Sequence, residues 1–388
     1  MTAKRSVLQR WLRLRQGLRG LSARWHRMFL RRHRRGSASP RVLFYAADDL
    51  SDQYIRRVGR AVVAVAHDPW FATRHPDEPV DWHPRRTSVR WAPYRWWDLV
   101  VVANHAPLVF PRGTPMLGVL HGIVRSRPVA EGSYWYAPSR MLDAHGEPVF
   151  ARLLDASDVS RLEGERFVPQ LAGRIRVVGD LRADDVLAAA SHSPPREQVV
   201  VMSTWGPEAL VPRHLEALAP ALAAAAETLG LRVVVTSHPN LWRPQPHRRQ
   251  RDHSPDLLGL RDLGFTVLPP DEDWAPWLAS SRAAICDHTS LAANFALLDR
   301  PILPVEIPAA MIGSETFTAS LYDHVEPWVP DQDLGERLRE LLAAGLPPAV
   351  HRAAADRCDH RGQAAEQVVA AFAELLDDRR DPRDQPGS

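Results

Sequence analysis

Short apolar runs alternate with segments of helical spacing along most of the chain beyond residue 40. The apolar runs predict buried strands, at 42–46, 99–103, 116–120, 134–137, 175–178, 199–202, 233–236, 265–268 and 283–285. Between them, apolar residues three and four apart predict helices, at 54–66, 207–229, 274–280, 291–298, 334–342 and 349–376. Strands that are apolar on both faces and separated by helices indicate parallel sheets covered on both sides.

Two breaks in this pattern divide the chain. Residues 36–40, Gly-Ser-Ala-Ser-Pro, predict a hinge, and residues 188–196 predict a linker after which the alternation restarts. We therefore expect two doubly wound, Rossmann-like α/β domains at 41–187 and 197–376, and a disordered tail at 377–388. Ligands of such sheets bind beyond the carboxyl ends of the strands, so the fold predicts a cleft between the domains.

The segment before the hinge is strongly basic. Residues 1–35 contain twelve Lys or Arg and no acid. The rest of the chain therefore has 37 basic and 46 acidic residues, although the whole chain has a net charge of +3. Apolar residues recur there at alternating steps of four and three, and arginines fill the other face. This pattern predicts an amphipathic helix, 1–36, on an anionic membrane surface. The side chains expected to enter that surface are Trp11, Leu14, Leu18, Leu21 and Trp25.

Composition narrows the alternatives for this arm and for the body. A partner-docking helix and a solvated or RNA-binding tail remain possible for the arm, but the acidic body argues against nucleic-acid binding. No run of about 18 apolar residues exists to cross a membrane. The only cysteines, Cys286 and Cys358, lie far apart, which indicates a reducing compartment. We therefore expect a cytoplasmic protein that binds the membrane peripherally.

Polar residues follow five of the predicted strands. The clusters are His121-Gly122, then Gly179, Asp180, Arg182 and Asp184, then Ser203-Thr204-Trp205, then Ser237-His238-Pro239-Asn240, and finally Asp287-His288-Thr289-Ser290. Carboxyl ends of parallel strands meet at one edge of a sheet, so the clusters should face the same cleft. A neutral imidazole at His121 can take a proton from an attacking hydroxyl, and His238, Thr289 and Ser290 can hold a diphosphate. Ordinary helix capping explains any single cluster equally well.

Several common site types are absent from the sequence. It contains no G-x-G-x-x-G and no G-x-x-x-x-G-K-[ST], which argues against dinucleotide oxidoreductases and P-loop NTPases. It also lacks H-E-x-x-H and paired-cysteine signatures, so we expect no metal and no cofactor.

In this order, the clusters resemble the motifs of the CDP-glycerol glycerophosphotransferase family, the wall teichoic acid polymerases and primases. The family motif H-G-T-P corresponds to His121-Gly122, and G-Y-P-R-N-D to residues 179–184. P-T-W corresponds to residues 203–205, R-P-H-P to 237–239, and D-Y-S-S with the later L-x-R-P-I to 287–290 and 298–302. Gly362 resembles the glycine of the family's closing helix, and the order holds over roughly residues 114–370.

The resemblance implies a GT-B fold and transfer of a polyol phosphate from a CDP-activated or other nucleotide-diphosphate donor. The acceptor would be lipid-linked or polymeric, at the inner face of a bacterial cell membrane, in teichoic acid and cell-wall synthesis. His121 with Gly122 looks like the catalytic pair. The donor site implied by the resemblance comprises Arg182, Ser203, Thr204, Trp205, His238, Pro239, Asp287, Thr289 and Ser290.

The chain also departs from the family motifs. Ile-Val-Arg-Ser follows His121-Gly122, Thr236 and Ser237 stand where the family's arginine precedes the histidine, and Asn294 occupies a usually acidic position. Two other interpretations therefore stay open. One is a GT-B enzyme that uses a nucleotide sugar, as a glycosyltransferase or a relative of UDP-sugar 2-epimerases, and the other is a non-catalytic membrane-docked module.

Overall fold

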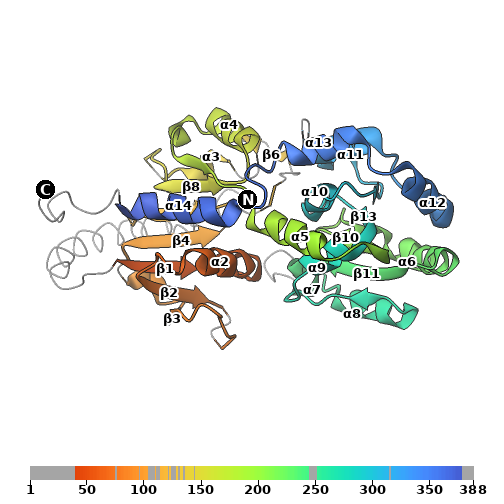
Figure 1. The fold of residues 1–388 in the computed structure, drawn as a ribbon, viewed down its shortest axis with the longest axis horizontal. Coiled ribbons are helices and arrows are strands. Elements are labelled where there is room, and N and C mark those ends of the chain that lie inside the picture. The colour runs from red at the N-terminus through yellow and green to blue at the C-terminus, as the bar shows by residue number, and fades with distance from the viewer. Residues whose placement is uncertain are drawn as a thin grey trace, which may run out of the picture.

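Two parallel sheets organise the protein, each flanked by helices (Figure 1). The first has seven strands in the order β3-β2-β1-β4-β5-β8-β9, and the second has five in the order β12-β11-β10-β13-β14. Every pairing within them is parallel, which confirms the predicted doubly wound α/β architecture. The computed structural model describes residues 40–74, 77–95, 97–103, 110, 114–120, 122–123, 128–129, 132–133, 136–143, 145–243, 251–313 and 316–377.

The strands are short, as expected for sheets buried on both faces. Those of the first sheet are β1 (Arg41–Tyr45), β2 (Asp68–Thr73), β3 (Arg85–Ser88), β4 (Leu99–Ala103), β5 (Met116–Val119), β8 (Arg152–Asp155) and β9 (Ile175–Val177). Those of the second are β10 (Arg196–Ser203), β11 (Arg232–Ser237), β12 (Thr266–Val267), β13 (Ser281–Cys286) and β14 (Ile302–Pro304). A separate antiparallel pair joins β6 (Pro128–Val129) to β7 (Gly132–Ser133).

The helices cover both sheets. Around the first sheet are α2 (Asp49–Val62), α3 (Pro138–Met141) and α4 (Asp158–Phe167), and then comes α5 (Leu181–His192). The second half contains α6 (Leu210–Leu229), α7 (Pro239–Trp242), α8 (Ser254–Gly259), α9 (Ala275–Ser280), α10 (Leu291–Ala296), α11 (Phe317–His324), α12 (Leu334–Ala344), α13 (Pro348–Ala355) and α14 (Ala364–Asp377). Short 3₁₀ turns lie at Ala92–Tyr94, Pro169–Leu171, Leu260–Leu263 and Ala309–Met311.

Three predicted elements differ from the structure. Tyr136 and Ala137 are not in a strand, because Tyr136 turns inward to donate its hydroxyl to Asp155 and Pro138 then begins α3. The predicted linker 188–196 is largely ordered structure, since α5 continues to His192 and β10 begins at Arg196. The single helix predicted at 349–376 is two helices, and the chain reverses between them at His360 and Gly362, which have positive φ.

The chain crosses between the two sheets twice. Helix α5 follows β9 of the first sheet and packs on α9 of the second, whereas α14 follows the second sheet and packs on α2 (Figure 1). Phe372 of α14 stacks on Phe44 of β1, with ring centroids 6.3 Å apart, inside one apolar cluster. The predicted domain bounds, 41–187 and 197–376, stay a prediction. Helix α14, which belongs to the second range in sequence, packs into the core of the first sheet.

The two crossings are joined to each other. Asp184 in the first turn of α5 accepts hydrogen bonds from the amides of Gly362 (2.6 Å) and Ala364 (2.8 Å), so it caps the start of α14. Gly179 lies so close to the 359–360 backbone that a Cβ there would come within 2.6 Å of the Asp359 carbonyl oxygen. Its φ of +82° also requires glycine.

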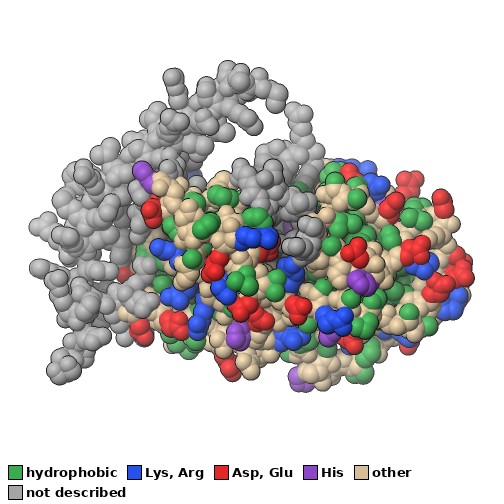
Figure 2. Space-filling model, turned by 90° about the horizontal axis from the view of Figure 1, so that it is seen from above, with side chains coloured by type: hydrophobic (Ala, Val, Ile, Leu, Met, Phe, Trp, Pro, Cys, Tyr) green, Lys and Arg blue, Asp and Glu red, His purple; other side chains and the backbone are tan. Residues whose placement is uncertain are grey.

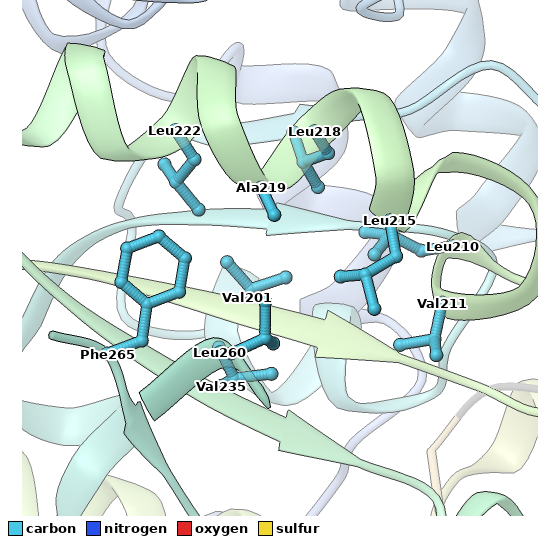
Figure 3. A pocket seen from close by; sticks show the side chains of 10 residues that line it. All are labelled: Val201, Leu210, Val211, Leu215, Leu218, Ala219, Leu222, Val235, Leu260 and Phe265. Atoms are coloured by element: carbon cyan, nitrogen blue, oxygen red, sulfur yellow. The ribbon is translucent and has the colours of Figure 1, made fainter. Parts of the chain in front are cut away.

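One small void lies inside the second half, between α6 and the sheet (Figure 3). Its volume is about 10 Å³ and its walls are apolar, with Val201, Leu218 and Phe265 among them. A space of about one water molecule with no polar partner stays dry. We therefore interpret it as a packing gap in the core rather than a ligand site.

The described surface carries both signs of charge. In the view of Figure 2, Lys and Arg side chains are interspersed with Asp and Glu over the described atoms. No helix within the described ranges is long and apolar enough to cross a membrane. The predicted membrane arm, 1–36, and the predicted disordered tail after Asp377 lie outside the described residues.

Asp184→Ala should loosen the crossing of α14. The amides of Gly362 and Ala364 lose their acceptor, which should lower the free energy of unfolding by about 1–2 kcal/mol. Urea denaturation measures this loss. Asp262→Ala, at an exposed acid on the 260–263 turn, is the control and should change stability by less than about 0.5 kcal/mol. Equal stability of the two variants would contradict the capping role.

Candidate active site

The second sheet reverses its strand order at β10, whose neighbours are β11 and β13. In sheets of this kind the crevice at such a reversal is the usual place for a ligand. Met202 of β10 pairs with Cys286 of β13, so Ser203 and Asp287 emerge side by side at the carboxyl edge. The sequence clusters after these two strands therefore meet, as predicted from their positions.

Asp287 links the two strand ends through a buried carboxylate. Its side chain is fully buried, and it accepts hydrogen bonds from the Ser203 hydroxyl (3.1 Å), the Thr204 amide (3.0 Å) and the Leu210 amide (2.7 Å). The Ser203 hydroxyl in turn accepts from the Val211 amide at 3.1 Å. Asp287 and Ser203 thus hold the loop 204–210 and the first turn of α6, and they shape the site without facing it.

Trp205 and His238 lie beside this loop. Their ring centroids are 5.9 Å apart, and both side chains are half-buried. His238 is also the N-cap of α7, where its Nδ1 accepts from the Asn240 amide at 3.1 Å and Pro239 opens the helix. An Nδ1 that accepts a hydrogen bond places the proton of a neutral imidazole on Nε2.

Thr289 and Ser290 begin α10. Thr289 is buried and its hydroxyl accepts a long hydrogen bond, 3.4 Å, from the Leu291 amide, whereas Ser290 is half-buried and its hydroxyl makes no capping bond. Asn294, one turn further along, is 1% exposed and therefore points into the core. Of these two hydroxyl residues, Ser290 is the more exposed.

Gly122 brings the first sheet to this point. It follows β5 with a φ of +79°, and a Cβ there would lie 3.5 Å from Cβ and 3.6 Å from Oγ of Ser290. Its amide donates a hydrogen bond to Asp180 Oδ2 at 3.2 Å. Gly122 of the predicted catalytic pair and Ser290 of the predicted donor cluster, 168 positions apart in sequence, are therefore close neighbours in space. His121 itself lies outside the described residues.

Arg182 lies apart from the edge formed by β10 and β13. It is 1% exposed, its guanidinium stacks on Trp274 with 3.8 Å from Cζ to the ring centroid, and Nη1 donates to Gln53 Oε1. Burial, reinforced by the nearby charge of Arg57, lowers its pKa to about 10. In this position Arg182 joins α2, α5 and the start of α9. Its predicted role as a donor ligand stays a prediction.

Further contacts between the two halves surround Arg182 and had no signal in the sequence. Arg57 on α2 pairs with Asp185 on α5 (2.6 Å) and with Asp273 before α9 (3.2 Å). Gln53 donates to the Pro270 carbonyl at 2.8 Å. Neither Arg57 nor Gln53 belongs to a motif. An isolated Arg or Gln on a helix is usually exposed to solvent, so the sequence offered no reason to place them at a junction.

Comparison with known proteins places the chain in a recognised fold. No known sequence family and no curated protein sequence matches it. Among solved structures, a variant of the wall teichoic acid polymerase TagF is similar with a TM-score of 0.60 and 12% identity over 88% of this chain and 90% of that one. Another TagF structure has a TM-score of 0.58 and 12% identity, covering 89% and 91%. UDP-GlcNAc 2-epimerase from Neisseria meningitidis, bound to UDP-GlcNAc, has a TM-score of 0.51 and 10% identity, covering 86% and 100%.

These similarities confirm the predicted fold. The chain has a GT-B architecture, two doubly wound α/β halves joined by crossing helices, and TagF structures are among its structural neighbours, as the motif resemblance led us to expect. Sequence identities of 12% and below support a shared fold but give no information about the reaction. Within the part of the chain that the structure describes, no group of three or more His, Cys, Asp or Glu is arranged to hold a metal ion.

Asp287→Ala should destabilise the second half strongly. It leaves the Thr204 and Leu210 amides without their acceptor, whereas the Ser203 hydroxyl keeps the Thr204 carbonyl. The cost should be about 3 kcal/mol in unfolding free energy. Asp287→Asn keeps one acceptor oxygen and should cost less. Chemical denaturation should rank the wild type above Asp287→Asn and that above Asp287→Ala. Asp323→Ala, at an exposed position, should have the stability of the wild type. An Asp287→Ala protein of wild-type stability would refute the anchoring role of Asp287.

Proposed function

We propose that this protein is a membrane-peripheral transferase that moves a polyol phosphate from a CDP-activated donor to a lipid-linked or polymeric acceptor. The observation that carries the proposal is the proximity of Gly122, which follows β5, to Ser290, which follows β13: a Cβ added at Gly122 would lie 3.5 Å from Cβ of Ser290. The motifs that resemble those of the glycerophosphotransferases include both residues, Gly122 in the proposed catalytic pair and Ser290 in the proposed donor set. The GT-B fold and the TagF neighbours are compatible with it.

In this proposal the donor diphosphate lies against the second sheet. Ser290 and Thr289 would contribute hydroxyl groups and His238 its imidazole, as the motif resemblance implies. Trp205 flanks His238 and supplies an aromatic wall. Asp287 accepts hydrogen bonds from the Thr204 and Leu210 amides, so the backbone of the loop between them is preorganised for a ligand.

The transfer step needs one base and one leaving group. An acceptor hydroxyl oxygen attacks the phosphorus of the polyol phosphate and forms a new P–O bond, while the P–O bond of the diphosphate breaks and CMP leaves with the electron pair. His121, directly before Gly122 in the sequence, would take the hydroxyl proton. The charge that develops on the phosphate oxygens would be stabilised by Ser290 and His238.

The basic arm fits an acceptor held at a membrane. Its twelve cations and the apolar stripe of Trp11, Leu14, Leu18, Leu21 and Trp25 would place the enzyme on anionic lipid at the inner face of the cell membrane. The body needs no membrane-spanning segment for this, because the arm alone supplies both charge and apolar area.

A nucleotide-sugar enzyme is the second candidate. The N. meningitidis 2-epimerase shares the fold and was solved with UDP-GlcNAc. This chain also lacks the arginine that precedes the histidine in the family motif, and its Asn294 replaces a usual acid. Both differences concern donor recognition, so the nucleotide is the feature that separates the candidates.

Nucleotide binding provides the first test of the donor site. CMP or CDP-glycerol should raise the thermal midpoint of the full-length protein, and UDP should not. A UDP-specific shift would favour the second candidate, and no shift with any nucleotide would favour a non-catalytic module. Thr289→Ala combined with Ser290→Ala should weaken CDP-glycerol binding at least about 10-fold. Thr318→Ala with Ser320→Ala on α11 is the matched control and should bind like the wild type.

A second test addresses the base. His121→Ala should reduce transfer of glycerol phosphate by about 100-fold or more, because the hydroxyl proton has no acceptor. Binding of CDP-glycerol should remain within about 2-fold of the wild type, since the donor lies on the other sheet. Radiolabelled transfer and calorimetry measure the two quantities. Full turnover by His121→Ala would exclude the assignment.

A further inference from the structure

Asp180 is bonded to more of the protein than its place at a helix start requires. As the N-cap of α5, it accepts through Oδ1 from the amides of Arg182 (2.8 Å) and Ala183 (2.9 Å). Its second oxygen accepts from the Gly122 amide at 3.2 Å, 58 positions away in sequence. The side chain is 4% exposed, so water does not compete for these bonds.

Asp333 shows what a capping aspartate does without this third bond. It caps α12 through Oδ1 with the same pattern, accepting from the amides of Gly335 (2.8 Å) and Glu336 (3.1 Å). Both of its hydrogen bonds stay inside its own helix turn. The bond to Gly122 is therefore an addition to capping, and it reaches a turn that follows a different strand.

The geometry at Gly122 gives this bond a consequence at the site. Gly122 has a φ of +79°, which only glycine adopts easily, and a Cβ added there would lie 3.5 Å from Cβ of Ser290, so the two residues are near neighbours across the sheets. The next residue, Ile123, is 1% exposed and belongs to the core cluster of the second sheet. The bond from the Gly122 amide to Asp180 adds a backbone anchor beside it. Asp180 is in turn fixed by α5, the helix that joins the two sheets.

We propose that Asp180 is a positioning residue that holds the Gly122 turn against Ser290 and so sets the spacing between the acceptor-side and donor-side walls of the site. The proposal rests on the proposed function, since it assigns to those walls the two reacting groups. The family motif has tyrosine at this position, so the device belongs to this chain. Burial raises the pKa of Asp180, and the three amides oppose that effect by stabilising the carboxylate.

The test separates positioning from capping. Asp180→Ser keeps a good N-cap residue for α5, but its shorter side chain has a single oxygen and loses the Gly122 bond. Displacement of a reacting group by about 1 Å can cost 100-fold in rate. We expect kcat for glycerol phosphate transfer from CDP-glycerol to fall by about 10- to 100-fold, with KM for the donor within about 2-fold. Amide hydrogen exchange at Gly122 should become faster.

Asp333→Ser is the control for capping, because it makes the same change at a cap with the same two amide bonds but in an exposed position. It should leave kcat and Gly122 exchange unchanged, and it should lower the thermal midpoint by less than Asp180→Ser because the Asp333 bonds are exposed to water. Equal kcat losses in both variants, or unchanged kcat in Asp180→Ser, would overturn the proposal. If Asp180→Ser does not fold, Asp180→Asn serves instead, since its amide nitrogen cannot accept from Gly122 while its oxygen still caps α5.

The readouts also separate this proposal from the proposed function. A wild-type protein that transfers nothing from CDP-glycerol would refute the proposed function alone. Hydrogen exchange still decides the role of Asp180 in that case, because it needs no substrate. Gly122 exchange that is the same in wild type and Asp180→Ser would overturn the positioning role whatever the reaction.

Discussion

Two carboxylates at the start of α5, those of Asp180 and Asp184, accept hydrogen bonds from backbone amides. The arrangement of the two sheets depends on these bonds. Asp180 bonds the turn after β5, and Asp184, one helical turn later, bonds the start of α14. Amide donors stabilise a carboxylate, so Asp180 can be buried and Asp184 half-buried at this junction. Because α5 and α14 are the two crossings of the chain, the segment from Gly179 to Asp184 fixes both halves relative to each other.

The second half uses the same principle at Asp287. Its carboxylate is enclosed by one hydroxyl and two amides, and it anchors the loop that borders the site. The acidic members of the motifs thus act on the protein backbone, whereas Ser290 and His238 remain half-buried at the edge. A motif written as a string of letters combines residues of both kinds, and burial separates them.

The fold was largely predictable from the sequence because most strands are apolar on both faces. The exceptions have physical reasons. β3, with the sequence Arg-Arg-Thr-Ser, is an edge strand exposed to solvent, and β8 starts with an arginine and ends with an aspartate, so neither has the apolar signature. The helix period of α14 indicates an apolar face but cannot specify that this face packs on α2 of the other half. The position of polar residues after β10 and β13 led us to expect that Ser203 and Asp287 lie at one edge, and they are hydrogen-bonded there. The proximity of Gly122 to Ser290 could not be predicted, because it depends on how two separate sheets are joined.

The burial of Arg182 bears on the proposed donor site. In the family motif this arginine is the one cation of its segment, yet here it stacks on Trp274 between α2, α5 and α9. The arginine expected before His238 is replaced by Thr236 and Ser237, and both are buried. The edge formed by β10 and β13 therefore has hydroxyl and imidazole groups in place of guanidinium groups. Neutral donors held by a rigid frame can stabilise a phosphate when their positions are preorganised. Under the proposed function, the amide-bonded carboxylates Asp180, Asp184 and Asp287 would build that frame, so the same interaction that joins the two halves would also preorganise the site.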